Sequence, residues 1–178
     1  MNNGIIIYKS KYGTTKKYAE WLAKEINYDI IEYSKAKINQ ITKYQNIIFC
    51  GAIYASGISC LSILKKNFET LQNKNIAFFC IGASPYNEKA FNDIKQHNLK
   101  DELQNIPIFY GRGAWDESKM KFIDRTLCNM LKKIVSKKDP ATYEPWESAL
   151  MQALGRNCDW SDKEYLQPLI SLTQDWDK

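Results

Sequence analysis

The chain has 178 residues, of which 44% are hydrophobic, and it contains 8 glycines and 5 prolines. This composition fits one globular domain with a full core and excludes a disordered chain. The formal net charge of +5 is spread along the chain. Because no segment is dense in lysine or arginine, nucleic-acid binding is not expected, whereas acidic partners or a membrane surface are favoured.

Two further features concern location and redox state. No apolar run approaches the roughly 18 residues that cross a bilayer, and residues 1–4 lead into a strand without the pattern of a secretion signal. A cytoplasmic location is therefore the expectation. The five cysteines are an odd number without close pairs, which argues against a disulfide framework and against a zinc site. Cys50 and Cys80 end apolar runs and are expected in the core.

Five short apolar runs are expected to form strands, and apolar residues at helical spacing lie in the intervals between them. The strands are expected at 5–8, 29–33, 47–50, 76–81 and 107–110. The helices are expected at 16–26, 61–71, 87–103 and 118–135, with a short helix within 34–45. Alternating strands and helices imply parallel pairing through right-handed crossovers. The prediction is an α/β fold, a doubly wound five-stranded parallel sheet in the order 2-1-3-4-5.

The loop after the first strand has the features of an anion-binding site at a helix N-terminus, where free amides and the helix dipole favour a phosphate. Ser10, Thr14 and Thr15 place three hydroxyl groups within six residues. Gly13 removes a Cβ where the backbone must approach a ligand. The basic residues around it are Lys9, Lys11, Lys16 and Lys17. The alternative is a Ser/Thr cap on an ordinary turn between a strand and a helix.

Ligands of such sheets bind outside the carboxyl ends of the strands, so the loops after the third and fourth strands are informative. The first of these loops reads Gly51-Ala52-Ile53-Tyr54-Ala55-Ser56-Gly57, and the second reads Gly82-Ala83-Ser84-Pro85-Tyr86-Asn87. Each opens with a glycine and carries a tyrosine three or four residues later. The alternative explanation is that turns favour Gly, Ser, Pro and Asn in any case.

The first loop resembles the phosphate-binding loop of flavodoxins, whose usual pattern is Ser/Thr-x-Thr-Gly-x-Thr. Here the match is Ser10-x-x-Gly13-Thr14-Thr15, and Tyr12 stands where the family usually has a threonine. The loop at 51–57 and the segment 108–125 resemble the flavodoxin-domain subgroup that includes the bacterial menaquinone-dependent protoporphyrinogen oxidase. The similarity covers about residues 4–135.

The resemblance implies that FMN is the cofactor and that backbone amides and two tyrosines meet its isoalloxazine. The expected cofactor-binding residues are Ser10, Lys11, Tyr12, Gly13, Thr14, Thr15, Ala52, Ile53, Tyr54, Ala55, Gly57, Gly82, Ala83, Ser84 and Tyr86. No catalytic side chain and no metal ligand are expected, because the isoalloxazine performs the electron transfer.

The expected function is that of an FMN-binding redox protein. Carrier flavodoxins are typically acidic whereas this chain is basic, which favours an oxidoreductase, or a carrier with an atypical partner such as a quinone or a membrane-bound donor. A flavodoxin-type carrier and a flavin-free scaffold of the same fold stay as alternatives. A receiver domain needs carboxylates where this chain has Tyr8, Lys9, Cys50 and Gly51, and a P-loop needs a Gly-Lys-Ser/Thr that is missing.

The C-terminal part is expected to extend a single domain, with a core at about 4–136 and a helical extension at about 140–178. Helices are expected at 144–154 and at 161–173, the second interrupted at Pro168. Two interpretations stay open for this part, a structural packing arm and a cover over the flavin or a partner surface.

Overall fold

A computed structural model describes residues 3–176. Its central sheet contains five parallel strands in the order β2-β1-β3-β5-β6, and this confirms the predicted α/β fold and strand order. The strands are β1 (Gly4–Lys9), β2 (Asp29–Glu32), β3 (Asn46–Tyr54), β5 (Asn75–Gly82) and β6 (Ile108–Arg112). A further short strand, β4 (Gly57–Ile58), pairs antiparallel with the end of β3.

Both faces of the sheet are covered, because the central strands are apolar on both sides. On one face Phe49 stacks on Phe78 with 4.9 Å between ring centroids. On the other face Tyr18 packs on Phe79 at 5.0 Å. Cys50 and Cys80 are fully buried in these layers, as expected.

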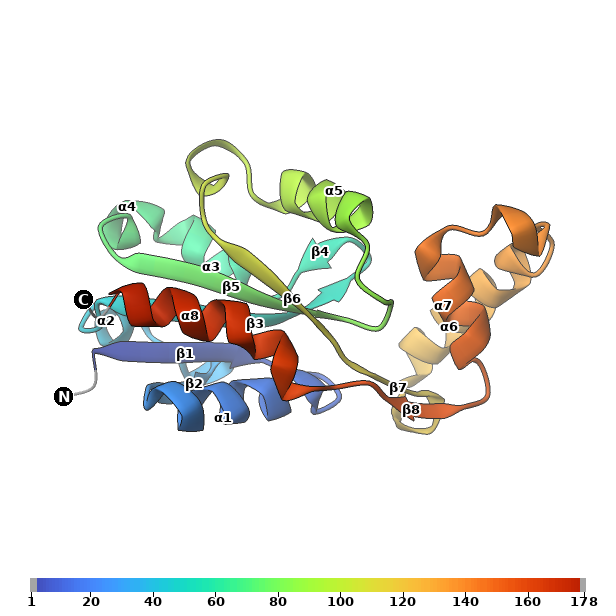
Figure 1. Ribbon diagram of the computed structural model, residues 1–178, viewed down its shortest axis with the longest axis horizontal. Coiled ribbons are helices and arrows are strands. Elements are labelled where there is room, and N and C mark those ends of the chain that lie inside the picture. The colour runs from blue at the N-terminus through green and yellow to red at the C-terminus, as the bar shows by residue number, and fades with distance from the viewer. Residues whose placement is uncertain (1–2, 177–178) are drawn as a thin grey trace.

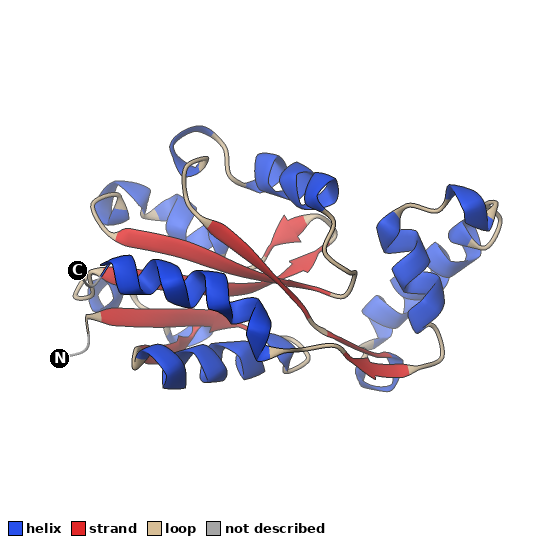
Figure 2. Ribbon diagram, in the orientation of Figure 1, coloured by secondary structure: helices blue, strands red, loops and turns tan. Residues whose placement is uncertain are grey.

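The first face is covered by the helices between β2 and β6 (Figures 1 and 2). They are α2 (Ile38–Ile41), α3 (Leu61–Lys66), α4 (Phe68–Leu71) and α5 (Glu88–Asn98), with short 3₁₀ turns η1 (Tyr33–Lys35) and η2 (Asp101–Leu103). The helix expected at 61–71 is divided in two at Asn67, whose backbone leaves the helical region. The helix expected at 87–103 ends at Asn98 for the same kind of reason, since Leu99 is extended.

The second face is covered by α1 (Thr14–Ile26) and α8 (Gln167–Trp176), which pack against each other. Pro168 does not interrupt the last helix, because it lies in the first turn of α8, where a missing amide proton costs nothing. The chain therefore returns from far along the sequence to complete the layer on this face (Figure 1).

Between β6 and α8 the chain leaves the sheet (Figure 1). This excursion contains β7 (Ala114–Asp116), η3 (Glu117–Lys119), α6 (Phe122–Val135), η4 (Pro140–Thr142), α7 (Pro145–Ala153), β8 (Asn157–Asp159) and η5 (Lys163–Leu166). β7 and β8 pair as an antiparallel ribbon that the sequence did not indicate. α6 lies within the helix expected at 118–135, and it leaves most of its apolar residues exposed because it packs beside α7 and not on the sheet.

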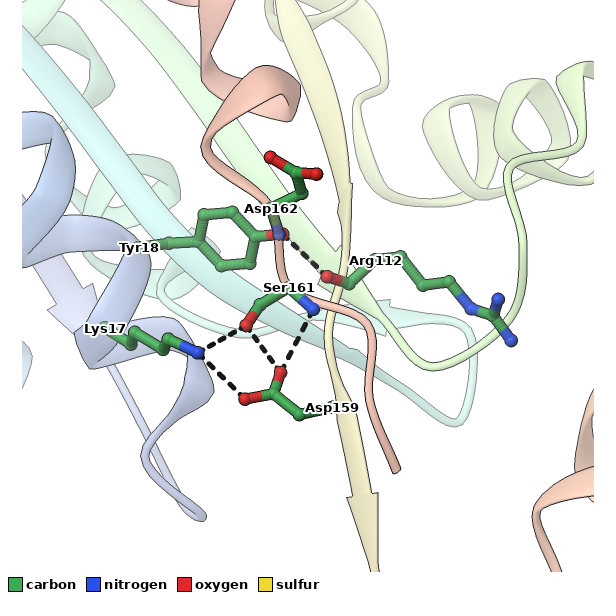
Figure 3. Close-up of polar contacts among 6 residues, drawn as sticks. All are labelled: Lys17, Tyr18, Arg112, Asp159, Ser161 and Asp162. Atoms are coloured by element: carbon green, nitrogen blue, oxygen red, sulfur yellow. Dashed lines mark hydrogen bonds and ion pairs between the residues drawn. The ribbon is translucent and has the colours of Figure 1, made fainter. Parts of the chain in front are cut away.

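Polar contacts fix the base of this excursion against α1 (Figure 3). The Lys17 ammonium donates to Asp159 at 2.8 Å and to Ser161 at 2.7 Å. The Tyr18 hydroxyl donates to the Arg112 carbonyl at 2.7 Å and accepts from the Asp162 amide at 3.0 Å. Burial raises the pKa of Tyr18 to about 12, so this hydroxyl keeps its proton at neutral pH. Through its two hydrogen bonds it links β6 to the chain that returns from the excursion.

Among residues 3–176, none of the helices combines the length and the apolar character needed to cross a bilayer.

Candidate functional site

The loops after β1, β3 and β5 leave the sheet at its carboxyl edge, on the side toward the excursion (Figure 1). This is the edge where doubly wound sheets bind their ligands. The candidate site is built from these three loops and from the beginning of α6.

The loop after β1 has the backbone of an anion-binding turn. Gly13 adopts φ 99° immediately before α1, a conformation that side chains disfavour, and its amide donates to the Ser10 Oγ at 3.1 Å. A Cβ at Gly13 would meet nothing within 4 Å, so the demand for glycine is conformational. The ladder of α1 begins with the Lys17 amide and the Gly13 carbonyl, 2.9 Å apart. The backbone amides before Lys17 therefore have no carbonyl partner within α1 and point outward from its first turn. This arrangement suits a bound phosphate.

Several of the lysines around this turn are engaged in other contacts. Lys17 is held by Asp159, Lys16 lies 3.6 Å from Glu20, and the Lys9 ammonium lies 4.9 Å from the centre of the Tyr33 ring. Lys11 lies closest to the loops of interest, 4.9 Å from the centre of the Tyr54 ring. The charges of Lys16 and Lys17 are thus partly compensated, by Glu20 one helical turn away and by Asp159 from a distant part of the sequence.

The strongest compensation comes from Asp124 in the first turn of α6. Its carboxylate accepts hydrogen bonds from the hydroxyls of Tyr12 and Tyr54, and the Lys11 ammonium lies at 2.5 Å. Only 4% of the residue is exposed. We call Lys11, Tyr12, Tyr54 and Asp124 the Asp124 cluster. It joins the loops after β1 and β3 to the excursion.

The protonation states in this cluster follow from its contacts. The hydrogen bond from Lys11, together with those from the two tyrosines, lowers the pKa of Asp124 to about 2. The pKa of Lys11 is raised by its bond to Asp124. The pKa of Tyr12 is raised by burial and then by Asp124, and that of Tyr54 is raised by Asp124. At neutral pH the cluster therefore holds one carboxylate, one ammonium and two neutral hydroxyls.

The loop after β3 is a tight hairpin and not the open loop that we expected. β3 continues to Tyr54, turns at Ala55 and Ser56 with φ 46° and 64°, and returns through Gly57. Two central residues with positive φ are typical of a type I′ turn. The Tyr54 ring is presented at the end of this hairpin and is 48% exposed.

Two polar side chains, those of Asn98 and Ser59, hold the hairpin in place. The Asn98 side chain accepts from the Ile58 amide at 3.0 Å and donates to the Ser56 carbonyl at 2.6 Å. The Ala52 amide donates to the Ser59 Oγ at 2.8 Å. This amide is therefore satisfied within the protein, and the expected contact of Ala52 and Ile53 with a flavin stays a prediction.

The loop after β5 is tied to β6. The Gly82 carbonyl accepts from the Gly113 amide at 2.7 Å, the Ala83 carbonyl accepts from the Arg112 Nε at 3.0 Å, and the Ser84 carbonyl accepts from the Tyr110 hydroxyl. Tyr86 is 56% exposed, and its ring lies 5.8 Å from that of Tyr110 and 5.7 Å from that of Phe91. The loop is thus rigid, and Tyr86 belongs to a different aromatic group from Tyr54.

Of the site residues predicted from the sequence, the structure brings together Lys11, Tyr12 and Tyr54, beside the turn at Ser10 and Gly13. Asp124 and Asn98 were missed as site residues. Asp124 lies in a segment whose similarity to flavodoxin domains was noted, but nothing local indicated what its carboxylate would contact. Asn98 follows the polar pair Gln96-His97 and gave no signal of burial.

A doubly wound parallel sheet with a glycine turn before its first helix, and with hydrogen-bonded loops at the carboxyl edge, places the chain among the doubly wound α/β proteins. Within this class, the model of the flavodoxin domain family matches residues 5–142, and the chain belongs to that family.

Similar solved structures include a WrbA-like flavodoxin from Agrobacterium tumefaciens, with 19% identity over 70% of this chain and 88% of the other, at a TM-score of 0.46. Two-electron reduced flavodoxin from Megasphaera elsdenii is similar at 13% identity over 60% of this chain and 82% of the other, with a TM-score of 0.42. The Trp repressor binding protein from Bacillus subtilis is similar at 17% identity over 62% and 81%, with a TM-score of 0.41. No protein of curated function matches the sequence of this chain.

Proposed function

We propose that this chain is a flavoprotein that binds FMN at the carboxyl edge of its sheet and transfers electrons through it. The observation that carries the proposal is the turn at Gly13, which opens the start of α1 beside a cluster that already holds an anionic group. The Asp124 carboxylate is an internal anion held by one ammonium and two hydroxyls, so the donors of this region suit a negatively charged ligand. Membership of the flavodoxin domain family supports the same cofactor.

The expected cofactor-binding residues would contact two different parts of FMN. Ser10, Thr14 and Thr15, with the amides at the start of α1, would hold the phosphate. Tyr54 and the backbone of Gly82 to Ser84 would border the isoalloxazine, and the bonds of this second loop to β6 keep it in place before a ligand arrives. FMN supplies the electron transfer when bound, and the protein supplies binding and orientation.

We further propose an oxidoreductase, with a redox protein or a quinone as its electron partner. A net charge of +5 is unfavourable for docking on the basic surfaces that bind acidic carriers. The resemblance over about residues 4–135 to the subgroup with menaquinone-dependent protoporphyrinogen oxidase supports a quinone. Electron exchange with flavodoxin reductases but not with quinone analogues would contradict this part of the proposal.

One observation favours the flavin-free scaffold as a second candidate. The Tyr12 hydroxyl, at the position where the family usually has a threonine, donates to Asp124 and accepts from the Lys121 amide at 3.1 Å. It is therefore occupied by α6 and does not serve the phosphate in this arrangement.

The decisive experiment is the visible absorption spectrum of the purified protein before and after addition of FMN. Flavin bands that stay with the protein through gel filtration are expected, whereas a colourless protein that FMN does not bind would favour the scaffold. Thr14→Ala and Thr15→Ala should each weaken FMN binding by roughly 1–3 kcal/mol if they hold the phosphate. Thr70→Ala, at an exposed position of α4, is the matched control and should leave the affinity unchanged.

A further inference from the structure

The helix α6 exposes a row of large apolar side chains. Phe122 is 84% exposed and Ile123 is 70% exposed, and four further residues of the helix are 39–55% exposed. These four are Leu127, Met130, Leu131 and Ile134. We call the six residues the α6 apolar face. Soluble monomers seldom leave so many large apolar groups together in water. We therefore expect a partner to cover this face when the protein functions.

The face has a basic border. The cationic residues from η3 to the turn that follows α6 are Lys119, Lys121, Arg125, Lys132, Lys133, Lys137 and Lys138. Lys119 pairs with Asp116 and Lys138 pairs with Glu147. Within the described residues 3–176, no ion pair engages Lys121, Lys132, Lys133 or Lys137. The one carboxylate on the helix, Asp124, is turned into the Asp124 cluster and does not offset these charges at the surface.

The placement of α6 leaves this face accessible. The excursion stands away from the sheet on the β7–β8 ribbon, and α7 packs along one side of α6 (Figure 1). The Lys138 ammonium at 2.5 Å from Glu147, and the capping box between Glu144 and Glu147, fix the link between the two helices. Val135 is fully buried while Ile134 beside it is 55% exposed, so the helix has a covered side and an open side.

We propose that the α6 apolar face binds the surface of a bilayer that contains anionic lipids, with α6 lying in the interfacial plane. An apolar face beside unpaired lysines is the pattern of interfacial helices, in which burial of apolar side chains and attraction to lipid phosphates act together. With 14 residues the helix is too short to span the bilayer, so it would lie on the surface.

The charges select this occupant over a second copy of the chain. Two α6 faces packed against each other would bring their lysine borders together, and like charges at an interface are unfavourable. An anionic lipid surface instead attracts the lysines at the edge of the apolar face, such as Lys133. Because Asp124 ties the first turn of α6 to the loops after β1 and β3, a bilayer bound at α6 would lie next to the candidate cofactor site; this last step alone depends on the proposed function.

The test is co-sedimentation of the 178-residue chain with vesicles, without added FMN. Binding is expected to vesicles of phosphatidylcholine with about one third phosphatidylglycerol, and not to phosphatidylcholine alone. Lys133→Glu with Lys137→Glu should weaken binding roughly tenfold or more, because each lysine near an anionic surface contributes to it. Lys65→Glu with Lys66→Glu is the matched control, since it makes the same charge change on the exposed side of α3 and should preserve most of the binding.

Met130→Gln with Ile134→Gln tests the apolar part. Glutamine keeps the helix propensity while removing apolar area, so anionic vesicles should be bound more weakly and circular dichroism should be unchanged. Equal binding to neutral and anionic vesicles, or equal effects of the two lysine pairs, would overturn the proposal. No vesicle binding, together with a concentration-dependent dimer in sedimentation that Met130→Gln/Ile134→Gln abolishes, would overturn it in favour of a second copy. FMN titration without vesicles reports on the proposed function separately.

Discussion

The Asp124 carboxylate accepts a hydrogen bond from the Tyr12 hydroxyl, and through this contact α6 reaches the turn that opens the first helix of the sheet. The two residues are 112 positions apart in the sequence. Tyr54 completes the contact from the neighbouring loop. An acidic residue thus lies beside a turn that is built for an anion, and it contacts three of the side chains that we expected at the cofactor, those of Lys11, Tyr12 and Tyr54.

The first prediction concerns competition between Asp124 and the phosphate. Asp124→Asn removes the negative charge and frees Lys11 and Tyr12, so the affinity for FMN should rise roughly twofold to fivefold, the size of one partly screened charge interaction. Titration by quenching of FMN fluorescence measures this change. Asp175→Asn, which removes one charge near the end of α8, is the control for net charge. A lower affinity in Asp124→Asn would mean that Asp124 orients the tyrosines for the cofactor.

The second prediction concerns pH. The pKa of Asp124 is lowered from 3.8 to about 2 by Lys11 and the two tyrosines. A carboxyl group whose pKa is lower in the folded state stabilises that state above its unfolded pKa and loses the effect as the pH falls through the folded value. The amides of the first turns of α6 should therefore lose protection against hydrogen exchange between about pH 4 and pH 2, after correction for intrinsic rates.

The control for this experiment is β5, whose backbone pairs with β3 and β6 in the centre of the sheet. Asp124→Asn should remove the pH dependence in α6 and give low protection at every pH. If α6 keeps its protection at about pH 1.5, where Asp124 is mostly protonated, the cluster does not hold the helix in place.

The third prediction concerns the hairpin that presents Tyr54. Asn98→Ala removes the acceptor of the Ile58 amide and the donor to the Ser56 carbonyl, and it should lower the free energy of unfolding by roughly 1–3 kcal/mol because buried polar groups lose their partners. Urea unfolding followed by circular dichroism measures this. Gln96→Ala, exposed on the same helix, should change stability little. Equal stabilities of the two variants would contradict the assigned role of Asn98.

The fourth prediction concerns the thiols. Burial raises the pKa of Cys50 and Cys80 and raises that of Cys60 to about 12, so these three should stay unreactive in the native protein. Cys128 and Cys158 are half-buried and should react first with a chromogenic disulfide reagent at pH 8. Denaturant should expose all five. Rapid reaction of more than two thiols in the native state would mean that the core opens locally.

Much of the sheet was predictable because its information is local. The runs Ile5–Ile7 and Ile47–Cys50 are apolar at consecutive positions, as strands covered on both faces must be, and glycine with hydroxyl residues after the first run indicated the turn before α1. The strand order followed from the alternation of strands and helices. The expected end of the core near residue 136 and the binding of the site residues to FMN stay predictions.

The sequence by itself thus determined the α/β class, the strand order and the turn at Gly13, because each rests on the spacing of residues close together in the chain. The tertiary structure alone decided that α8 covers the sheet while α6 stands outside it with its apolar face open. It also decided that the lysine-rich turn receives Asp124 and Asp159. Periodicity shows that a helix has an apolar side but not what packs on it, and charge balance at a site depends on residues that only folding brings within a few ångströms.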